Sequence, residues 1–307
     1  MIVIFEPYGR LCNRLFLSAY GMALARASGQ RFVNLSLGEY RYHFPATRPP
    51  RGLPIWRFHL YIRAIIAGLK CFPPARRWFV QIGWRNAGAF SPDNPEFLAQ
   101  LKNRSLTIIE GWADPSQIRF SPDTVADIRE TFAPDAATSE IAQATVGRAR
   151  EGADVLIGVH MRQKDYRTYL QGFFYYQPED YQRILEAMAA MFPGRRVAFL
   201  ICSDEELKTE SLAPFRITMG PGTLLGDLYS LAGCDYLIGP PSTFSLWAAF
   251  YAAKPIYHML EPTPPADLSA FMIPDGHFEC IDLKLFDPEA QRSRAQRFPH
   301  FRAPQGE

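Results

Sequence analysis

The sequence contains no apolar run near the roughly 20 residues that a membrane-spanning helix needs. Its start, MIVIFEPYGR, lacks the basic region and the apolar region of a signal peptide. Its 5 cysteines are scattered and form no C-x-x-C pair, which argues against a disulfide framework and against a zinc site. We therefore expect a protein of the reducing cytoplasm that neither spans a membrane nor carries a signal peptide.

Several catalytic motifs are also missing. The chain has no G-x-x-x-x-G-K-[ST] phosphate loop, no G-x-G-x-x-G after its first apolar run, no G-x-S-x-G elbow and no H-E-x-x-H helix. A D-x-D tripeptide, which would hold Mg²⁺ or Mn²⁺ against a diphosphate, is absent as well. If a diphosphate leaves from this protein, arginine and helix amides must stabilise its charge, and we expect no metal and no other cofactor.

What is present suits a globular protein, because 48% of the 307 residues are hydrophobic and 21% are charged, enough for two domains of ordinary size. Short aliphatic and β-branched runs predict buried parallel strands at 2–5, 32–35, 106–109, 155–160, 197–202 and 236–238. Helical patterns alternate with them at 13–28, 122–132 with Ser121 as N-cap, 178–192 and 244–253. This alternation predicts α/β layers.

The weakly patterned stretch 133–152 is the expected domain boundary, which gives domains 1–150 and 151–307. Within the first domain, segment 40–92 has no acidic residue, nine Arg and Lys residues and many aromatic residues. Such a composition suits a membrane surface, nucleic acid or an anionic substrate, or alternatively a solvated face balanced by acidic residues elsewhere. We expect a peripheral membrane contact and no nucleic acid. Helical spacing favours an apolar stripe at Ile62, Ile65, Ile66 and Leu69, with Arg63 and Lys70 near lipid head groups.

Three of the predicted strands lead directly into polar segments, which are HMRQKD at 160–165, SDEE at 203–206 and PPSTFS at 240–245. In open α/β sheets, ligands bind at the carboxyl ends of strands, where helix N-termini present backbone amides. A cation, carboxylates and hydroxyl groups gathered there suit a nucleotide diphosphate. The fork of Arg162 can pair with phosphate oxygens. Alternatively, Arg162 pairs with Asp165 or Asp204 only to seal a loop.

The other polar residues have equally distinct alternatives. His160 ends an apolar strand, where a histidine is more often part of the core than a catalyst. Asn13 lies near a helix start and binds a sugar hydroxyl or a phosphate, or is an ordinary N-cap. Ser242, Thr243 and Ser245 bind phosphate through hydroxyl groups and amides, or cap the helix that follows.

Matching segments between residues 9 and 249 carry a family resemblance. They are GRLCNRLF at 9–16, EGW at 110–112, HMRQKDY at 160–166, ICSD at 201–204, DLYSL at 227–231 and STFSLWAA at 242–249. In this order and spacing they resemble the alpha-1,2-fucosyltransferase family and, more distantly, the protein O-fucosyltransferases and alpha-1,6-fucosyltransferases. The match to the family's H-x-R-R-x-D-Y is the most specific.

The resemblance implies an α/β fold of the GT-B kind, with two Rossmann-like domains whose parallel sheets face across a cleft. It implies an inverting, metal-independent transfer of fucose from GDP-fucose to a hydroxyl group of a glycan or glycolipid. The domain 151–307 would hold the donor, and the domain 1–150, with its insertion 40–92, would meet the acceptor. The implied donor-binding residues are His160, Arg162, Asp204, Ser242, Thr243 and Ser245, and the implied catalytic residues are Arg162, Asn13 and Asp165.

The chain departs from the family pattern at four positions: Gln163 replaces a second arginine, Lys164 a glycine, Cys12 a glycine and Arg14 a glutamine. Lys164 can return the charge that is lost at Gln163. A related transferase for another nucleotide sugar and a non-catalytic nucleotide-sugar or glycan-binding module stay open as alternatives. The general base is Asp165, Asp114, Glu110 or none, and Asp165 ranks first because it shares the loop of Arg162.

Overall fold

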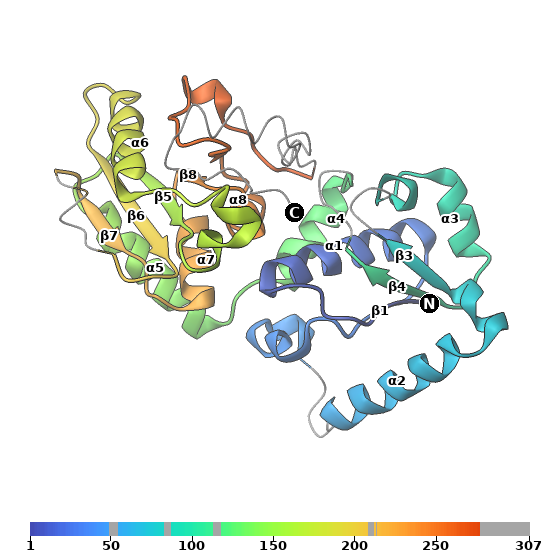
Figure 1. Ribbon diagram of the computed structural model, residues 1–307. Coiled ribbons are helices and arrows are strands. Elements are labelled where there is room, and N and C mark those ends of the chain that lie inside the picture. The colour runs from blue at the N-terminus through green and yellow to red at the C-terminus, as the bar shows by residue number, and fades with distance from the viewer. Residues whose placement is uncertain (49–54, 83–86, 113–117, 208–211, 213, 277–307) are drawn as a thin grey trace. The chain divides into compact units, whose positions relative to one another are not determined.

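The computed structural model describes residues 1–307 except 49–54, 83–86, 113–117, 208–211, 213 and 277–307 (Figure 1). Contacts within the chain form two compact units. The first comprises Met1–Asp135 and a short return segment that starts at Asp275, and the second comprises Ala136–Pro274. None of the helices in the described part is long and apolar enough to cross a membrane.

The first unit is built on a parallel sheet with the strand order β2-β1-β4-β3. Its strands are β1 (Ile2–Ile4), β2 (Phe32–Asn34), β3 (Phe79–Ile82) and β4 (Thr107–Gly111). Its α-helices are α1 (Leu11–Ser28), α2 (Ile55–Lys70), α3 (Pro95–Lys102) and α4 (Pro122–Thr131). The sheet has its apolar strand β1 in the middle, since all three residues of β1 are buried.

The second unit is built on a larger parallel sheet with the order β7-β6-β5-β8-β9. Its strands are β5 (Val155–Met161), β6 (Val197–Ser203), β7 (Ile217–Met219), β8 (Tyr236–Gly239) and β9 (Ile256–His258). Its α-helices are α5 (Ala136–Arg150), α6 (Pro178–Ala190), α7 (Leu224–Ala232) and α8 (Thr243–Ala252). Taken in chain order, the third, second, first, fourth and fifth strands lie side by side, which is the order of a Rossmann sheet.

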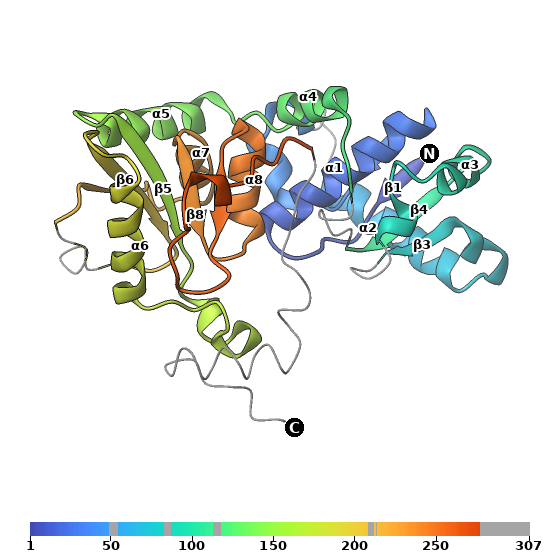
Figure 2. The same ribbon diagram turned by 90° about the horizontal axis from the view of Figure 1, so that it is seen from above.

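Helices cover both faces of the second sheet, with α5 and α6 on opposite sides (Figure 2). Because successive side chains of a strand point to opposite faces, alternate residues of β5 meet different helices. Val155, Ile157 and Val159 lie in one core cluster with Ile184 and Met188 of α6. On the other face a Cβ atom at Gly158 would lie 3.0 Å from Cys234 Sγ and Leu231 Cδ2, so a side chain here would press on the residues of α7 and the turn after it.

The structure confirms each strand and helix that the sequence predicts, with small shifts at the ends, and Ser121 is the N-cap of α4. It adds the short strands β3, β7 and β9 and the helices α3, α5 and α7. The compact units divide at Asp135, before α5, and not at residue 150 as expected. Helix α5 packs on α7 and β6, so the stretch that seemed weakly patterned is a layer of the second unit.

The basic segment 40–92 is partly neutralised by its own unit. Arg41 is buried and donates to the backbone carbonyls of Gly38 and Asn34, while Arg48 pairs with Asp135 at 2.9 Å. Lys70 pairs with the carboxylates of Glu6 and Glu110. The alternative of a face balanced by acidic residues therefore holds for Arg48 and Lys70, whereas Arg41 is buried against backbone carbonyls. The expectation that Lys70 lies near lipid head groups is not met, because Lys70 is paired with carboxylates of its own unit.

The expected apolar stripe in this segment is wrong as a single face. Ile66 is buried and points into the unit, whereas Ile65 is exposed, so the two do not share one surface. The side chains of Ile62 and Arg63 lie outside the described residues.

Candidate functional site

The candidate site lies where the strand order of the second sheet reverses. Strand β5 is flanked by β6 on one side and by β8 on the other, so the loops that follow β5 and β8 run to opposite sides of this point. Ligands of open α/β sheets bind at such a switch point, at the carboxyl ends of the strands. The two strands approach closely here, because a Cβ atom at Gly239 would lie 2.7 Å from the carbonyl oxygen of His160.

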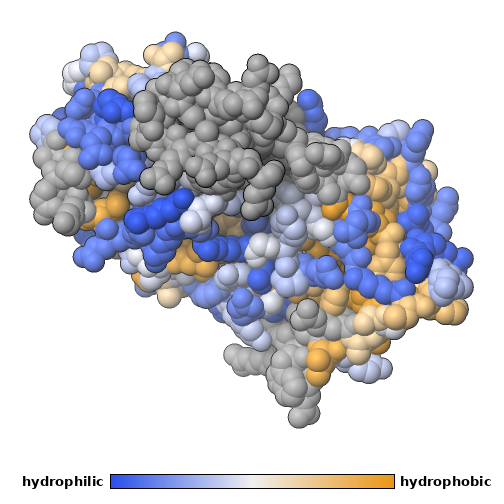
Figure 3. Space-filling view, viewed as in Figure 1, coloured by the Kyte–Doolittle hydropathy of each residue, from blue (hydrophilic) through white to orange (hydrophobic). Residues whose placement is uncertain are grey.

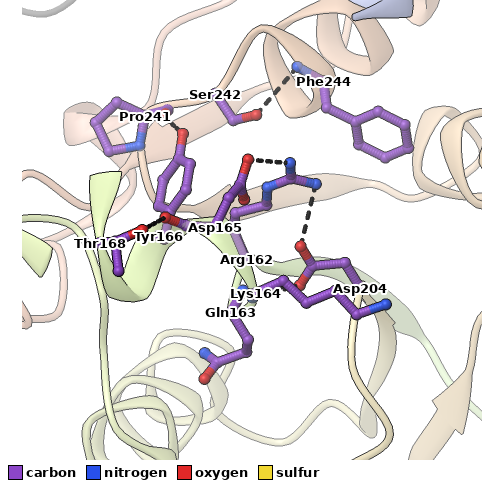
Figure 4. A network of polar contacts seen from close by, with 10 residues as sticks. All are labelled: Arg162, Gln163, Lys164, Asp165, Tyr166, Thr168, Asp204, Pro241, Ser242 and Phe244. Atoms are coloured by element: carbon purple, nitrogen blue, oxygen red, sulfur yellow. Dashed lines mark hydrogen bonds and ion pairs between the residues drawn. The ribbon is translucent and has the colours of Figure 1, made fainter. Parts of the chain in front are cut away.

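Arg162 comes directly after β5 and is held by two carboxylates (Figure 4). Its Nη2 atom lies 2.8 Å from Asp165 Oδ2, and its Nη1 atom lies 3.2 Å from Asp204 Oδ2. The ring of Tyr166 lies below the guanidinium, 5.7 Å from the Cζ atom to the ring centroid. The Arg162 side chain is 17% exposed, so its position is fixed while part of it still reaches solvent.

Asp204 fixes the loop as well as the arginine. Its Oδ1 atom accepts the backbone N–H groups of Gln163 at 2.8 Å and Lys164 at 3.3 Å. Because its other oxygen faces Arg162, both oxygens of Asp204 are engaged within the protein. Asp204 is thus a positioning residue in this structure, and the expected contact with the donor nucleoside stays a prediction.

The departures from the family pattern at Gln163 and Lys164 have different consequences. Gln163 is buried, and its Nε2 atom donates to the carbonyl of Tyr176 at 3.2 Å, so its side chain points into the core. Lys164 is exposed on the loop. The expected return of charge by Lys164 therefore stays a prediction.

Tyr166 ties the loop after β5 to the loop after β8. Its hydroxyl group donates to the carbonyl of Pro241 at 2.6 Å (Figure 4). Burial raises the pKa of Tyr166, so this hydroxyl group stays protonated and keeps donating at physiological pH. The link holds Arg162 and the start of α8 in one arrangement.

Helix α8 begins at this point with serine and threonine side chains. Ser242 is the N-cap, and its hydroxyl oxygen accepts the Phe244 N–H at 3.2 Å. Ser245 is buried, and its hydroxyl group donates to the Ser242 carbonyl at 3.2 Å. The capping alternative thus describes Ser242 correctly, and Ser245 is directed at the backbone. Thr243 is half-buried in the first turn. The N–H groups of this turn still form the kind of site that binds anions.

His160 is buried beside this helix start, with its ring 5.0 Å from the ring of Phe244. Burial and, secondarily, the charge of Arg162 lower the pKa of His160 to about 3. His160 is therefore neutral at physiological pH. His160 thus lies in the core, and within the described residues its Nδ1 atom has no hydrogen-bond partner.

The sequence interpretation assigned no role to Asp227, which lies in the first half of α7. Its Oδ1 atom accepts the Gly222 N–H at 3.0 Å, and a Cβ atom at Gly220 would lie 2.6 Å from both this oxygen and Cys202 Sγ. Burial raises the pKa of Asp227 to about 6. A buried carboxylate near the ends of β6 and β7 is a candidate for a ligand site. The sequence feature that could have indicated this residue is a single carboxylate in the otherwise apolar stretch LLGDLYSLA.

Asn13 belongs to the first unit, in the first turn of α1. Arg10 is the N-cap of α1, so Asn13 is not the N-cap that the alternative proposed. Gly9 adopts a φ of +62°, and a Cβ atom there would lie 2.1 Å from Asn13 Nδ2, so the amide packs against the loop before the helix. Arg14 braces the same loop, since its Nε donates to the Gly9 carbonyl at 3.2 Å.

The candidates for a general base differ in their surroundings. Asp165 is bound to Arg162, and Glu110 is paired with Lys70 in the first unit. Asp114 lies outside the described residues. No cluster of three or more His, Cys, Asp and Glu side chains suited to a metal ion occurs among the residues that the structure describes.

Comparisons with known proteins give structural matches only. No protein-family model matches the chain, and no curated protein matches it in sequence. A mutant of Arabidopsis thaliana FUT1 in complex with GDP has a TM-score of 0.57 at 13% identity, covering 91% of this chain and 75% of that one. The fucosyltransferase NodZ from Bradyrhizobium has a TM-score of 0.52 at 17% identity, covering 84% and 95%.

The apo form of POFUT1 has a TM-score of 0.51 at 14% identity, covering 83% of this chain and 96% of that one. At these identities the likeness concerns the fold. The chain therefore has an α/β fold with two parallel sheets that matches the GT-B structures of fucosyltransferases.

Proposed function

We propose that the chain is an inverting, metal-independent glycosyltransferase that moves fucose from GDP-fucose to a hydroxyl group of a glycan or glycolipid. The observation that carries the proposal is Arg162, held by two carboxylates at the switch point of the second sheet and tied through Tyr166 to the loop before α8. The donor is chosen because similar folds were solved with GDP or GDP-fucose, including NodZ with GDP and POFUT1 with GDP-fucose at a TM-score of 0.51.

In the proposed reaction, an acceptor hydroxyl oxygen attacks the anomeric carbon as the bond from that carbon to the diphosphate oxygen breaks. The main barrier is the negative charge that develops on the leaving diphosphate. Arg162 and the N–H groups that begin α8 would stabilise that charge most strongly in the transition state, which makes the contacts catalytic. The acceptor proton passes to a carboxylate or to water, and Asp165 stays the first candidate because it lies at the same loop.

The alternatives make different predictions for ligand binding. A transferase for another nucleotide sugar would bind a different nucleoside diphosphate more tightly than GDP. A non-catalytic nucleotide-sugar or glycan-binding module would bind GDP but would never release it from GDP-fucose.

The test is a thermal-shift screen of nucleoside diphosphates with and without EDTA. We expect GDP at about 100 times its Kd to stabilise the protein by about 2.7 kcal/mol, with the same shift in EDTA. A shift that EDTA abolishes would contradict metal independence. A rise in melting temperature with UDP or ADP but not with GDP would contradict GDP-fucose as the donor. GDP binding without GDP release from GDP-fucose would support the non-catalytic module instead.

We also propose that α2 and the turn after it contact an anionic membrane that carries a lipid-linked acceptor. The support is the exposure of large apolar side chains there: Leu60 is 65% exposed, Tyr61 68%, Ile65 41% and Phe72 58%. Figure 3 shows apolar surface on the part of the first unit that carries α2 in this view. Exposed apolar side chains beside the exposed cations Arg76 and Arg77 are typical of interfacial binding.

A further inference from the structure

The first sheet has a carboxyl edge of its own, which the site of the second unit does not use. In the order β2-β1-β4-β3, the strands β1 and β4 are neighbours, with Ile4 opposite Ile109. The loops after these two strands begin at the same edge of the sheet. By the rule for open α/β sheets, this edge is where the first unit should bind a ligand.

Two aromatic side chains meet at this edge. The rings of Tyr8, in the loop after β1, and Trp112, directly after β4, are stacked with centroids 5.3 Å apart and planes 16° apart. Tyr8 is 45% exposed. Because one face of its ring lies on Trp112, a second flat or apolar partner would stack on the opposite face.

The backbone fixes the position of Trp112. Gly111 adopts a φ of +92°, and a Cβ atom there would lie 1.9 Å from the carbonyl oxygen of Ile82. Trp112 N–H donates to that same carbonyl at 3.1 Å. Glycine is therefore required before the tryptophan, and the ring is held in place before any ligand arrives, which lowers the entropy cost of binding.

Charged groups lie two residues before each ring in the chain, Glu6 before Tyr8 and Glu110 before Trp112. Lys70 Nζ lies 3.3 Å from Glu6 Oε1 and forms an ion pair with Glu110, so it bridges the ends of β1 and β4. The hydrogen bond with Glu110 is the main cause that raises the pKa of Lys70, which stays charged. Two carboxylates and one ammonium group carry a net negative charge. They supply acceptors and donors that suit a ligand rich in hydroxyl groups.

We propose that Tyr8 and Trp112 form a stacking platform for a pyranose ring of the acceptor saccharide, with Glu6, Lys70 and Glu110 as partners for its hydroxyl groups. This inference rests on the proposed function for its ligand class. An uncharged sugar ring has an apolar C–H face for the Tyr8 ring and hydroxyl groups at its rim for carboxylates and ammonium. The Asn13 amide, in the first turn of α1, packs against Gly9, the residue after Tyr8.

The test is saturation-transfer NMR with three disaccharides as probes: lactose, cellobiose and N,N′-diacetylchitobiose, each titrated into the full chain. We expect at least one of them to bind, with its C–H face receiving the strongest transfer. Tyr8→Ala should weaken that binding about 3- to 10-fold, since an aromatic stacking contact contributes this much, and Tyr8→Phe should keep it. GDP affinity, measured by calorimetry, should be the same in all variants.

Tyr42→Ala is the matched control, because Tyr42 is a 52% exposed tyrosine of the same unit. It should leave disaccharide binding unchanged. If none of the disaccharides binds, or if Tyr8→Ala binds them as the wild type does, the platform is refuted even when GDP binds normally. If GDP does not bind but a disaccharide binds at Tyr8, the proposed function fails and the platform stands as a saccharide site.

Discussion

At the scale of single residues, Arg162 is held by two carboxylates and keeps donors for the proposed diphosphate. A guanidinium group has five N–H donors, and the contacts with Asp165 and Asp204 involve only its two terminal nitrogens. Donors therefore remain for phosphate oxygens, while the carboxylates keep the group from rotating. Turnover distinguishes this role from that of a purely structural arginine.

We predict that Arg162→Lys lowers GDP release from GDP-fucose at least about 100-fold, the usual loss when a donor to a developing negative charge is removed. Lysine keeps the charge but cannot reproduce the planar fork or the contact with both carboxylates. The measurement is the rate of GDP release with water as acceptor, together with GDP affinity and melting temperature.

Arg167→Lys is the matched control, since Arg167 lies in the same loop but is 53% exposed and pairs with Glu205. It should release GDP at nearly the wild-type rate. Near-normal turnover in Arg162→Lys, or a large loss of melting temperature with normal specific activity, would assign Arg162 to the structural role.

At the scale of elements, helix α2 is unusual because it exposes large apolar side chains. We predict that the double variant Arg76→Glu with Arg77→Glu binds anionic liposomes about 30-fold more weakly than the wild type. Each basic residue near such a surface contributes about 1 kcal/mol. Sedimentation with vesicles of phosphatidylserine and phosphatidylcholine measures this, and GDP binding should not change.

The matched control is Arg31→Glu with Lys102→Glu, which changes the net charge equally at two exposed positions of the first unit outside α2. It should sediment with the vesicles as the wild type does. Wild-type protein that stays in the supernatant with these vesicles would contradict the membrane contact.

At the scale of the whole molecule, buried titratable groups of the second unit set the dependence of stability on pH. Burial lowers the pKa of His160 to about 3 and that of His258 to about 4, and burial raises the pKa of Asp227 to about 6. The charges of Arg162 and His258 lower the pKa of His160 further, whereas that of Asp165 raises it. An unfolded histidine titrates near 6.5 and an unfolded aspartate near 3.9. Between pH 4 and 6 both histidines are neutral in the folded protein and become protonated when it unfolds. Asp227 is protonated in the folded protein and loses its proton when it unfolds.

We predict that the free energy of unfolding falls by about 1.4 kcal/mol per pH unit as the pH drops from 6 to 4, the effect of one net proton. The histidine contribution is fully present above 6.5 and is lost as the pH falls. The Asp227 contribution is present below about 4 and is lost as the pH rises to 6. In Asp227→Asn the proton that Asp227 releases on unfolding no longer offsets one of the two taken up by the histidines. The unfolding free energy should then change by about 2.7 kcal/mol per pH unit. Urea denaturation at several pH values measures both slopes, and equal slopes in the two proteins would contradict the assignment.

Sequence patterns predicted the elements whose signal is local. The run of Val155 to His160 is apolar and bounded, so it reads as a buried strand in isolation. The strands β3, β7 and β9 are short and only partly buried, and their pairing with a neighbour decides their conformation. Helix α5 exposes most of its surface and has a weak apolar stripe, so its packing on α7 was not visible in its own sequence.

By itself the sequence determined the α/β layers, the polar segments at strand ends and the residues of the Arg162 loop, because each depends on neighbours along the chain. Only the tertiary structure decided that Gln163 points into the core and that Asp204 contacts the loop after β5 with both oxygens. It also decided that Lys70 pairs with Glu6 and Glu110. The stacking of the Tyr8 and Trp112 rings likewise appears only in the tertiary structure. These contacts join residues far apart in the chain, and they form only when parallel strands place their carboxyl ends at one edge of a sheet.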